Sequence, residues 1–233
     1  MYRKVQLLLA ARPGKSLDDL DARLAAEGER VRALLPGDAR HLRAVRLADD
    51  PTAQTVHAAE MKGEPASFEA VFEVGSPGGD WAELTALFAG VVRNLADWIV
   101  AEKSAVIAGT EHVILPGECP LLLIFALRRL PALTSPQFHD YWLNRHAEVA
   151  RTVPVLRAYR QFHADAKASA AAGRALGLGI VDFEGAAQGY YRDIGDFMAI
   201  MAQPAVVADA LADEKRFIDH GRSVLGLYRV VGS

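Results

Sequence analysis

His146 is the residue of this chain whose type and spacing most favour chemistry. It lies in FHDYWLNRHAEVARTVP (138–154), where Phe138, Trp142 and His146 recur every four residues and Val149 follows three later. On an α-helix this spacing places all four on one face, which we expect to lie against a sheet. An imidazole among aromatic rings is costly to ionise and exchanges its proton near neutral pH. The pattern therefore favours His146 as a general acid or base.

A structural interpretation of the same residue stays open. Histidine is of intermediate burial in proteins and commonly finds a hydrogen-bond partner inside, so His146 could be an ordinary half-buried residue. His139 lies seven residues earlier, beside the first turn of the predicted helix, and we expect it to be exposed. The His139 and His146 pair is too widely spaced to chelate one ion.

A second set of candidates comes from predicted strands. Tyr159, Gln161 and His163 alternate in RAYRQFH and so share one face of a strand, whereas Tyr190 and Tyr191 fall on opposite faces of a later strand. If the first face lines an enclosed space, these groups form its wall; the alternative is a strand end that faces solvent. We predict substrate contacts from aromatic and polar side chains, namely Tyr141, Trp142, Tyr159, His163 and Tyr190.

Other classes of function lack support in the sequence. It contains no phosphate-binding glycine loop, no nucleophile elbow and no His, Cys or carboxylate cluster at metal spacing, so we predict no cofactor and no metal. The formal net charge is −3 with interspersed signs, which argues against a nucleic-acid partner. No apolar run approaches the length of a membrane span. The single cysteine, Cys119, permits no internal disulfide and fits a reducing cytoplasm.

The elements that must position these residues fall into two similar halves. A shift of 118 positions places Ser16 on Thr134, so that both become candidate helix N-caps with an acceptor three residues later. The same shift places Leu24 on Trp142 and Pro36 on Pro154. It also places Gly28 on His146, so the imidazole occurs in one half only. Either a function requires the imidazole in the second half, or the first half is a duplicated copy that has degenerated.

Each half predicts the order β-α-β-β-α-β, the arrangement of a ferredoxin-like α+β sandwich. We place the unit boundary at PGECP (116–120), which gives one unit over 1–116 and a second over 117–233. Segments 50–66 and 166–179 are predicted as long hairpin loops. Segments 80–106 and 194–219 are predicted as helices, the second interrupted by Pro204, and DEKR (213–216) as a solvated helix face. Terminal strands are expected at 111–115 and 224–231.

The second half resembles the EthD family of the dimeric α+β-barrel superfamily. The resemblance rests on LTSPQFHDYWLNRHAEVARTVPVLRAY, on Phe162 and His163, and on ADEKRFID (212–219), whereas the first half keeps only the architecture. It implies that two tandem ferredoxin-like units in one chain imitate the family's dimer, with two sheets face to face around an enclosed space. Family members are associated with degradation of small organic compounds and with aromatic polyketide or pigment pathways; relatives in the superfamily include cyclases, isomerases, monooxygenases and haem enzymes.

From these features we predict a cofactor-independent enzyme, of lyase or isomerase type, that acts on a small apolar or aromatic carbonyl compound with His146 as acid or base. One alternative is an oxidoreductase, including a haem-dependent version in which one histidine ligates iron. Another is a non-catalytic carrier that uses the same cavity. The fused repeat removes the need for a homodimer without forbidding one, and the fold alone leaves the reaction open.

Overall fold

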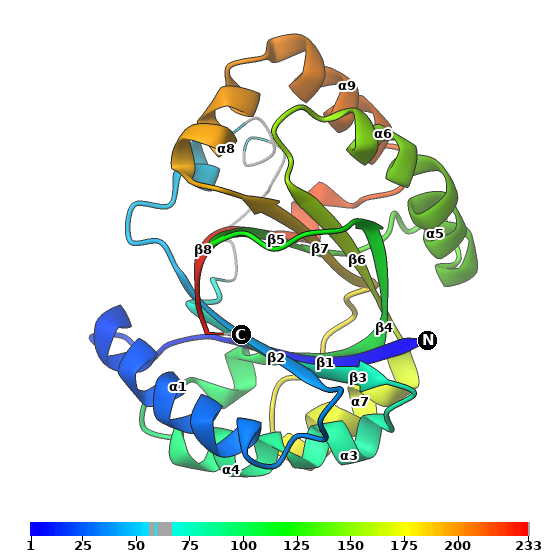
Figure 1. Cartoon of the computed structure of the whole chain (residues 1–233). Helices are drawn as coiled ribbons and strands as arrows, with labels where there is room; N and C mark the ends of the chain where they lie inside the picture. The colour runs from blue at the N-terminus through cyan, green and yellow to red at the C-terminus, as the bar shows by residue number, and fades with distance from the viewer. Residues whose placement is uncertain (56–58, 60–66, 233) are drawn as a thin grey trace.

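The computed structural model describes residues 1–55, 59 and 67–232, so most of the predicted loop at 50–66 lies outside the described residues. Eight antiparallel strands close into one barrel in the order β1-β3-β2-β8-β5-β7-β6-β4 (Figure 1). The predicted α+β barrel is confirmed. The strands are β1 (Tyr2–Leu9), β2 (Arg40–Arg46), β3 (Ala70–Pro77), β4 (Ala105–Leu115), β5 (Leu121–Leu127), β6 (Ala158–Ala164), β7 (Gly185–Tyr191) and β8 (Val224–Gly232).

Two seams join the strands of the first half to those of the second. β2 pairs with β8, and β4 pairs with β6. At the second seam a Cβ on Gly109 would lie 1.9 Å from the carbonyl oxygen of His163, so only glycine allows the two backbones to approach this closely. Barrel closure removes the free sheet edges that each half would otherwise expose.

Helices cover the outside of the barrel in two layers on opposite sides (Figure 1). One layer contains α1 (Leu17–Arg32), α3 (Trp81–Ala86), α4 (Phe88–Asn94) and α7 (Ala166–Leu176). The other contains α5 (Ser135–Tyr141), a π-helical turn η3 (Trp142–His146), α6 (Ala147–Thr152), α8 (Ile194–Met201) and α9 (Pro204–Glu214). The two helix N-caps predicted from the sequence are confirmed. The Ser16 side chain accepts a hydrogen bond from the Asp19 backbone amide, and Thr134 forms a capping box with Gln137.

The segment 166–179 was predicted as a loop, and this prediction is wrong. It forms α7, which Asp165 caps at the start and Gly177 ends in the left-handed conformation, at φ 67°. The run of alanines favours a helix, and its buried residues Ala172 and Leu176 pack in the apolar core of the first helical layer. A helix that follows β6 therefore covers the sheet of the first half.

The helix predicted over 80–106 is too long. α4 ends at Asn94, a short 3₁₀ turn η2 (Ala101–Lys103) follows, and β4 already begins at Ala105, six residues before the predicted strand. Ala105, Val106, Ile107 and Ala108 are all buried. A short apolar run buried on both faces fits a central strand as well as a helix by its periodicity, which explains the error. By contrast, the predicted break at Pro204 is confirmed.

Side chains fill much of the inside of the barrel, so the enclosed space predicted between the sheets is only partly realised. An eight-stranded barrel is just wide enough for its inward side chains to fill. One end is apolar and includes Leu8, Ile124, Phe162 and Tyr228. The other end is polar, with buried Lys4, Gln6, Glu73, Glu111, Arg160 and Gln188. His146 does not reach this interior, because the helix that carries it packs on the outside.

The loop 116–120 connects β4 to β5. The division into units 1–116 and 117–233, and with it the tandem repeat, stays a prediction. Within the described residues, no single helix has the length and apolar character needed to cross a membrane; the bent pair of α8 and α9 meets that test by length and composition alone.

Candidate functional site

The helical stripe predicted around His146 exists, but a π-helical turn interrupts it. Phe138 and Trp142 are fully buried and His146 is 8% exposed, all facing the outer surface of the second-half sheet. The wider π turn at Trp142–His146 frees a carbonyl, and the Gln161 side chain donates to the Trp142 oxygen at 2.7 Å. Such single π turns occur often at functional sites.

A carboxylate from another helix orients the His146 ring. Nδ1 of His146 lies 2.8 Å from Oδ2 of Asp213 on α9, and the Tyr141 hydroxyl donates to Oδ1 of the same carboxylate at 2.6 Å. Because a carboxylate only accepts, Nδ1 carries the proton, and in the neutral ring Nε2 keeps its lone pair. Nε2 has no hydrogen-bond partner among the described residues. This arrangement leaves one ring nitrogen to exchange a proton with a ligand.

The charges at this site follow from the same contacts. The hydrogen bond from His146 lowers the pKa of Asp213, against burial, which raises it; the Tyr141 hydrogen bond lowers it further. Burial, followed by the bond to Asp213, raises the pKa of Tyr141. Asp213 is therefore the ionised member of the group, and Tyr141 stays protonated as a donor.

An apolar cavity of about 130 Å³ adjoins His146 between the sheet and the helices. Its strand side includes Leu123, Phe125 and Tyr191, and its helix side includes Phe197, Ile200 and Val207. An apolar cavity of about 150 Å³ in another protein binds benzene. The space thus fits a molecule with a single aromatic ring.

The structure places Trp142 and Tyr159 at this cavity with His146. The Trp142 indole donates to the Tyr159 hydroxyl at 3.3 Å. Burial raises the pKa of Tyr159, so its hydroxyl stays protonated. Tyr141 acts instead behind His146, through Asp213.

His163 does not line the cavity. It stacks on the Trp142 ring, with ring centroids 4.3 Å apart and planes 12° from parallel. Its Nδ1 lies 2.8 Å from Nδ1 of His139, and its Nε2 lies 3.1 Å from the Gln161 side-chain oxygen. Burial, then nearby His139 and His112, lowers the pKa of His163 to about 2. The neutral ring supports Trp142.

Tyr190 lies on the opposite side of the sheet from His146. The two-residue period of β7 turns Tyr190 into the barrel and Tyr191 out to the cavity, because Tyr159 pairs with Gly189 and shares its face. Tyr191 is therefore the tyrosine of this strand that lies with Tyr159.

Asp213 is the residue that sequence reasoning missed. DEKR (213–216) was predicted as a solvated helix face, and this is wrong for its first two members: Asp213 binds His146, and Glu214, only 9% exposed, lines the cavity and bonds to His220 at 2.9 Å. α9 ends at Glu214, and Phe217 then packs on the His146 ring at 5.2 Å. The signal available was the ADEKRFID segment that shares in the EthD resemblance.

The described residues contain no group of three or more His, Cys, Asp or Glu side chains that could hold a metal ion. The surroundings of His146 fit a haem in one respect and not in another. A carboxylate behind an imidazole is the usual support of a metal-ligating histidine, and Asp213 provides it. The space does not fit, because a cavity of about 130 Å³ accepts one ring and a haem contains four pyrrole rings.

Comparisons with known proteins support the fold of the whole chain and the EthD resemblance of its second half. Residues 130–221 match the EthD domain, which confirms the predicted resemblance over that segment. No curated protein sequence is significantly similar to the chain.

Three solved structures illustrate the similarity of the whole chain. A candidate chlorite dismutase has a TM-score of 0.57 at 12% identity, covering 99% of this chain and 94% of its own. A candidate monooxygenase from Fusobacterium nucleatum has a TM-score of 0.56 at 9% identity, covering 98% and 91%. A haem-binding protein from Thermus thermophilus has a TM-score of 0.51 at 10% identity, covering 99% and 91%. At these identities the likeness shows the fold.

Proposed function

We propose that this chain is an enzyme that moves a proton on a small apolar or aromatic carbonyl compound, without a cofactor. The observation that carries the proposal is the His146–Asp213 pair beside an apolar cavity. The EthD match and the solved structures of the same fold, which include a candidate monooxygenase, support a role with small molecules.

In this proposal His146 is the acid and base. Nε2 accepts a proton from the carbon next to a carbonyl group, and the resulting imidazolium is stabilised by the Asp213 carboxylate at 2.8 Å. The proton then returns to another atom of the same molecule, so the step needs no oxidant or reductant. Isomerisation, aldol-type cyclisation and elimination of water contain such a transfer. A decarboxylation would use only its second part, in which His146 gives a proton to the carbon that has lost CO₂.

The neighbouring side chains prepare the cavity for this step. Tyr159 keeps its proton and can donate to the carbonyl oxygen, on which negative charge develops. Trp142, held between the cavity and His163, offers a flat apolar wall to an aromatic ring. Apolar surroundings exclude water and so strengthen both polar interactions.

Exchange of carbon-bound hydrogen with D₂O tests the proposal for any product. Single-ring aryl ketones, beginning with acetophenone, are incubated with the protein, and loss of the NMR signal next to the carbonyl is followed. We expect acceleration by the wild type and by His41→Gln, a control in the first half, but not by His146→Gln. Exchange at the buffer rate for the whole panel, or equal rates in His146→Gln, contradicts the proposal.

Two alternatives have distinct outcomes in the same preparation. Retention of a ligand by native mass spectrometry without exchange or product would identify a carrier. Haem-dependent oxidation is favoured only by the Asp213 support of His146 and by the fold shared with a haem-binding protein. A Soret band in the purified protein that disappears in His146→Gln would show haem bound through His146 and overturn the cofactor-free proposal.

A further inference from the structure

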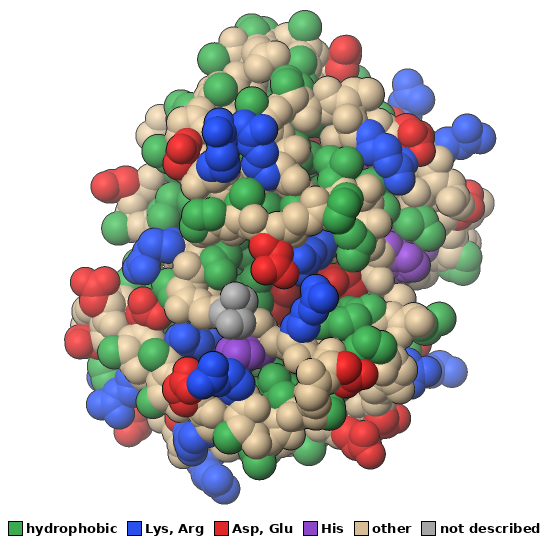
Figure 2. Space-filling model, viewed as in Figure 1, with side chains coloured by type: hydrophobic (Ala, Val, Ile, Leu, Met, Phe, Trp, Pro, Cys, Tyr) green, Lys and Arg blue, Asp and Glu red, His purple; other side chains and the backbone are tan. Residues whose placement is uncertain are grey.

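A second cavity opens at the polar end of the barrel, separate from the cavity at His146. It measures about 590 Å³ and is lined by side chains that include Lys4, Arg40, Glu73, Glu118 and Arg160. Acidic and basic side chains gather at the centre of this face, over the barrel opening (Figures 1 and 2). Its volume lies in the range of small-molecule sites. We refer to this cavity as the barrel mouth.

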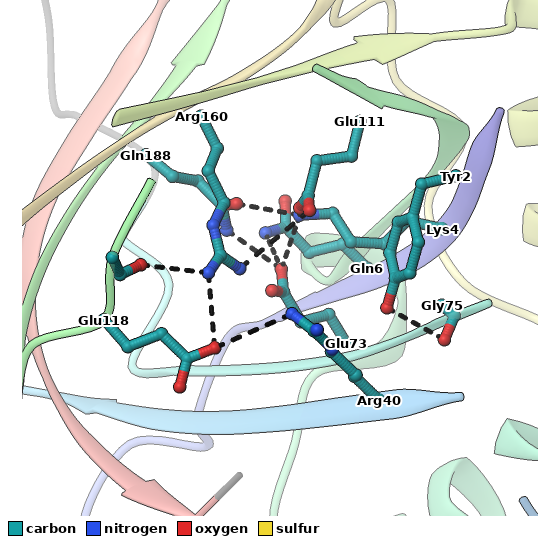
Figure 3. Close-up of polar contacts among 11 residues, drawn as sticks. Tyr2, Lys4, Gln6, Arg40, Glu73, Gly75, Glu111, Glu118, Arg160 and Gln188 are labelled. Carbon is teal, nitrogen blue, oxygen red and sulfur yellow. Dashed lines mark hydrogen bonds and ion pairs between the residues drawn. The ribbon is translucent and has the colours of Figure 1, made fainter. Parts of the chain in front are cut away.

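The innermost charges of the barrel mouth form ion pairs with one another. Lys4 donates to Glu111 at 2.6 Å and to Gln188 at 2.7 Å, and it lies 3.2 Å from Glu73 (Figure 3). Burial raises the pKa of Glu111, but nearby Lys4 outweighs it and the net direction is downward. Two carboxylates therefore face one ammonium at the floor of the cavity.

Two guanidinium groups from opposite strands approach one carboxylate above that floor. Nη2 of Arg160, on β6, lies 3.3 Å from Oε1 of Glu118, and Nη1 of Arg40, on β2, lies 3.9 Å from the same atom (Figure 3). Arg160 also lies 3.9 Å from Glu111 and donates to the Gly117 carbonyl. Glu118 thus marks where a carboxylate is bound by groups from both halves of the barrel.

Glu118 is held there weakly. Its side chain is 62% exposed, it lies in the loop between β4 and β5, and its partner Arg40 is 72% exposed. Exposed ion pairs of this kind contribute about 0 to 1 kcal/mol. Without Glu118 the lining carries four cationic and two anionic side chains, 4 − 2 = +2, from Lys4, Arg32, Arg40 and Arg160 against Glu73 and Glu111. Arg32 is already paired with Glu29, so one positive charge remains for an incoming carboxylate.

Near the barrel mouth are polar atoms that the protein does not use. Nε of Arg160, the Tyr190 hydroxyl and Oε1 of Gln6 are buried and have no hydrogen-bond partner among the described residues. Of these residues, Arg160 lines the barrel mouth, Tyr190 lines an adjoining pocket that shares Glu118 with it, and Gln6 lies behind the lining. Buried polar groups are almost always paired, so such atoms mark a place for polar occupants. Burial raises the pKa of Tyr190, which leaves its hydroxyl protonated and able to donate. The two donors, on Arg160 and Tyr190, suit a hydroxyl or carbonyl oxygen.

We propose that the barrel mouth binds a small polar monocarboxylate, such as a hydroxy acid, with its carboxylate between Arg40 and Arg160 in place of Glu118. The bound acid's other polar groups extend toward Nε of Arg160 and the Tyr190 hydroxyl. The site does not depend on the function proposed for His146, because the two cavities lie on opposite faces of the second-half sheet.

Calorimetric titration of the full chain with lactate, and with the neutral analogue lactamide, tests the proposal. We expect saturable binding of lactate and none of lactamide. Glu118→Ala removes the competing carboxylate and is expected to tighten binding about two- to fivefold. Arg40→Gln, at an exposed position, is expected to weaken binding about two- to fivefold, since an exposed ion pair with the bound carboxylate is lost.

Matched variants separate the site from general effects of charge. Glu148→Ala removes an exposed carboxylate that pairs with Arg151 on α6, and it should leave lactate affinity unchanged. His146→Gln should also leave it unchanged. No heat of binding in wild type and Glu118→Ala, equal affinities for lactate and lactamide, or an Arg40→Gln affinity equal to wild type would each overturn the proposal.

Discussion

The first helix of each half packs on the outside of the barrel, but the two helices differ in shape, and the apolar cavity adjoins the one in the second half. α1 is a regular helix of 16 residues with Leu20 and Leu24 fully buried. Its counterpart is broken into α5, a π turn and α6, and its buried stripe ends in His146. The 118-residue shift places Gly28 of α1 at the position of His146.

The difference lies in what the sheet presents beneath that position. In the first half, Arg43 extends against Gly28, and a Cβ there would meet Nε of Arg43 at 2.4 Å. The same shift places Arg43 on Gln161, which reaches only to the Trp142 carbonyl of the π turn. In the first half a long side chain therefore fills the space beneath the helix. In the second half Gln161 instead binds the widened turn at Trp142, which lines the cavity.

Of the changes considered, removal of the His146 imidazole should have the largest effect, because it removes the functional difference between the two halves. We expect His146→Ala to reduce turnover about 10²- to 10⁴-fold, the usual contribution of a general acid or base, with circular dichroism and Tm close to wild type. The measurement is the initial rate of hydrogen exchange in D₂O. His41→Ala, in the first half, provides the control. Unchanged turnover in His146→Ala would remove the functional difference between the halves.

Asp213→Asn should have the next largest effect. The amide cannot stabilise the imidazolium as a carboxylate does, so we expect turnover to fall about 10- to 100-fold. Because Asp213 positions His146 without touching the ligand, Kd for a ligand that is not turned over should change little. A loss of turnover matched by an equal weakening of Kd contradicts the assigned role. Asp209→Asn, on the same helix, is the control.

His163→Val, which copies Val45 of the first half, should flatten the dependence of stability on pH. His163 titrates at about 2 in the folded protein against 6.5 when unfolded, so below pH 6.5 the unfolded state binds the extra proton. The free energy of unfolding of the wild type should therefore decrease as the pH is lowered below 6.5, by up to about 1.4 kcal/mol per pH unit. Urea unfolding at pH 7.5 and 5.5 measures this. Equal pH dependence in wild type and variant excludes His163 as its source.

Gly28→Ala should give the smallest effect and tests the closed half directly. Overpacking against Arg43 costs about 1 to 3 kcal/mol, and the gain in helix propensity returns up to about 1. We expect a net loss near 1 kcal/mol in the free energy of unfolding. In an Arg43→Ala background the same change should stabilise the protein. A double-mutant cycle without coupling would show that Arg43 does not close this half.

Much of the barrel follows from the sequence, because strand alternation and helix caps are local signals. Ser16 and Thr134 mark the two helix starts, Pro204 marks a break, and the alternation in β7 separates Gln188 and Tyr190 from Tyr191. Which face of a strand points into the barrel is not local information. For this reason Tyr190 was grouped with His146, although the sheet separates them.

The candidate site was predictable only in part. The stripe of Phe138, Trp142 and His146 is visible from spacing, but its π turn depends on a side chain from β6, Gln161, that binds the freed carbonyl. Asp213 lies 67 residues from His146, and its charge resembled that of any exposed helix. Likewise, the alanine-rich segment of α7 is stable as a helix only because a distant sheet covers it.

The position of α7 determines how the chain would behave if it were divided. A fragment that ends in the loop 116–120 would lose α7 and leave part of the β4 surface bare, and the complementary fragment would carry a helix without its sheet. Neither piece should therefore be soluble when expressed alone, whereas co-expressed pieces should reassemble through the β2–β8 and β4–β6 seams. Cleavage of the intact protein in that loop should yield a nicked molecule that still migrates as one particle.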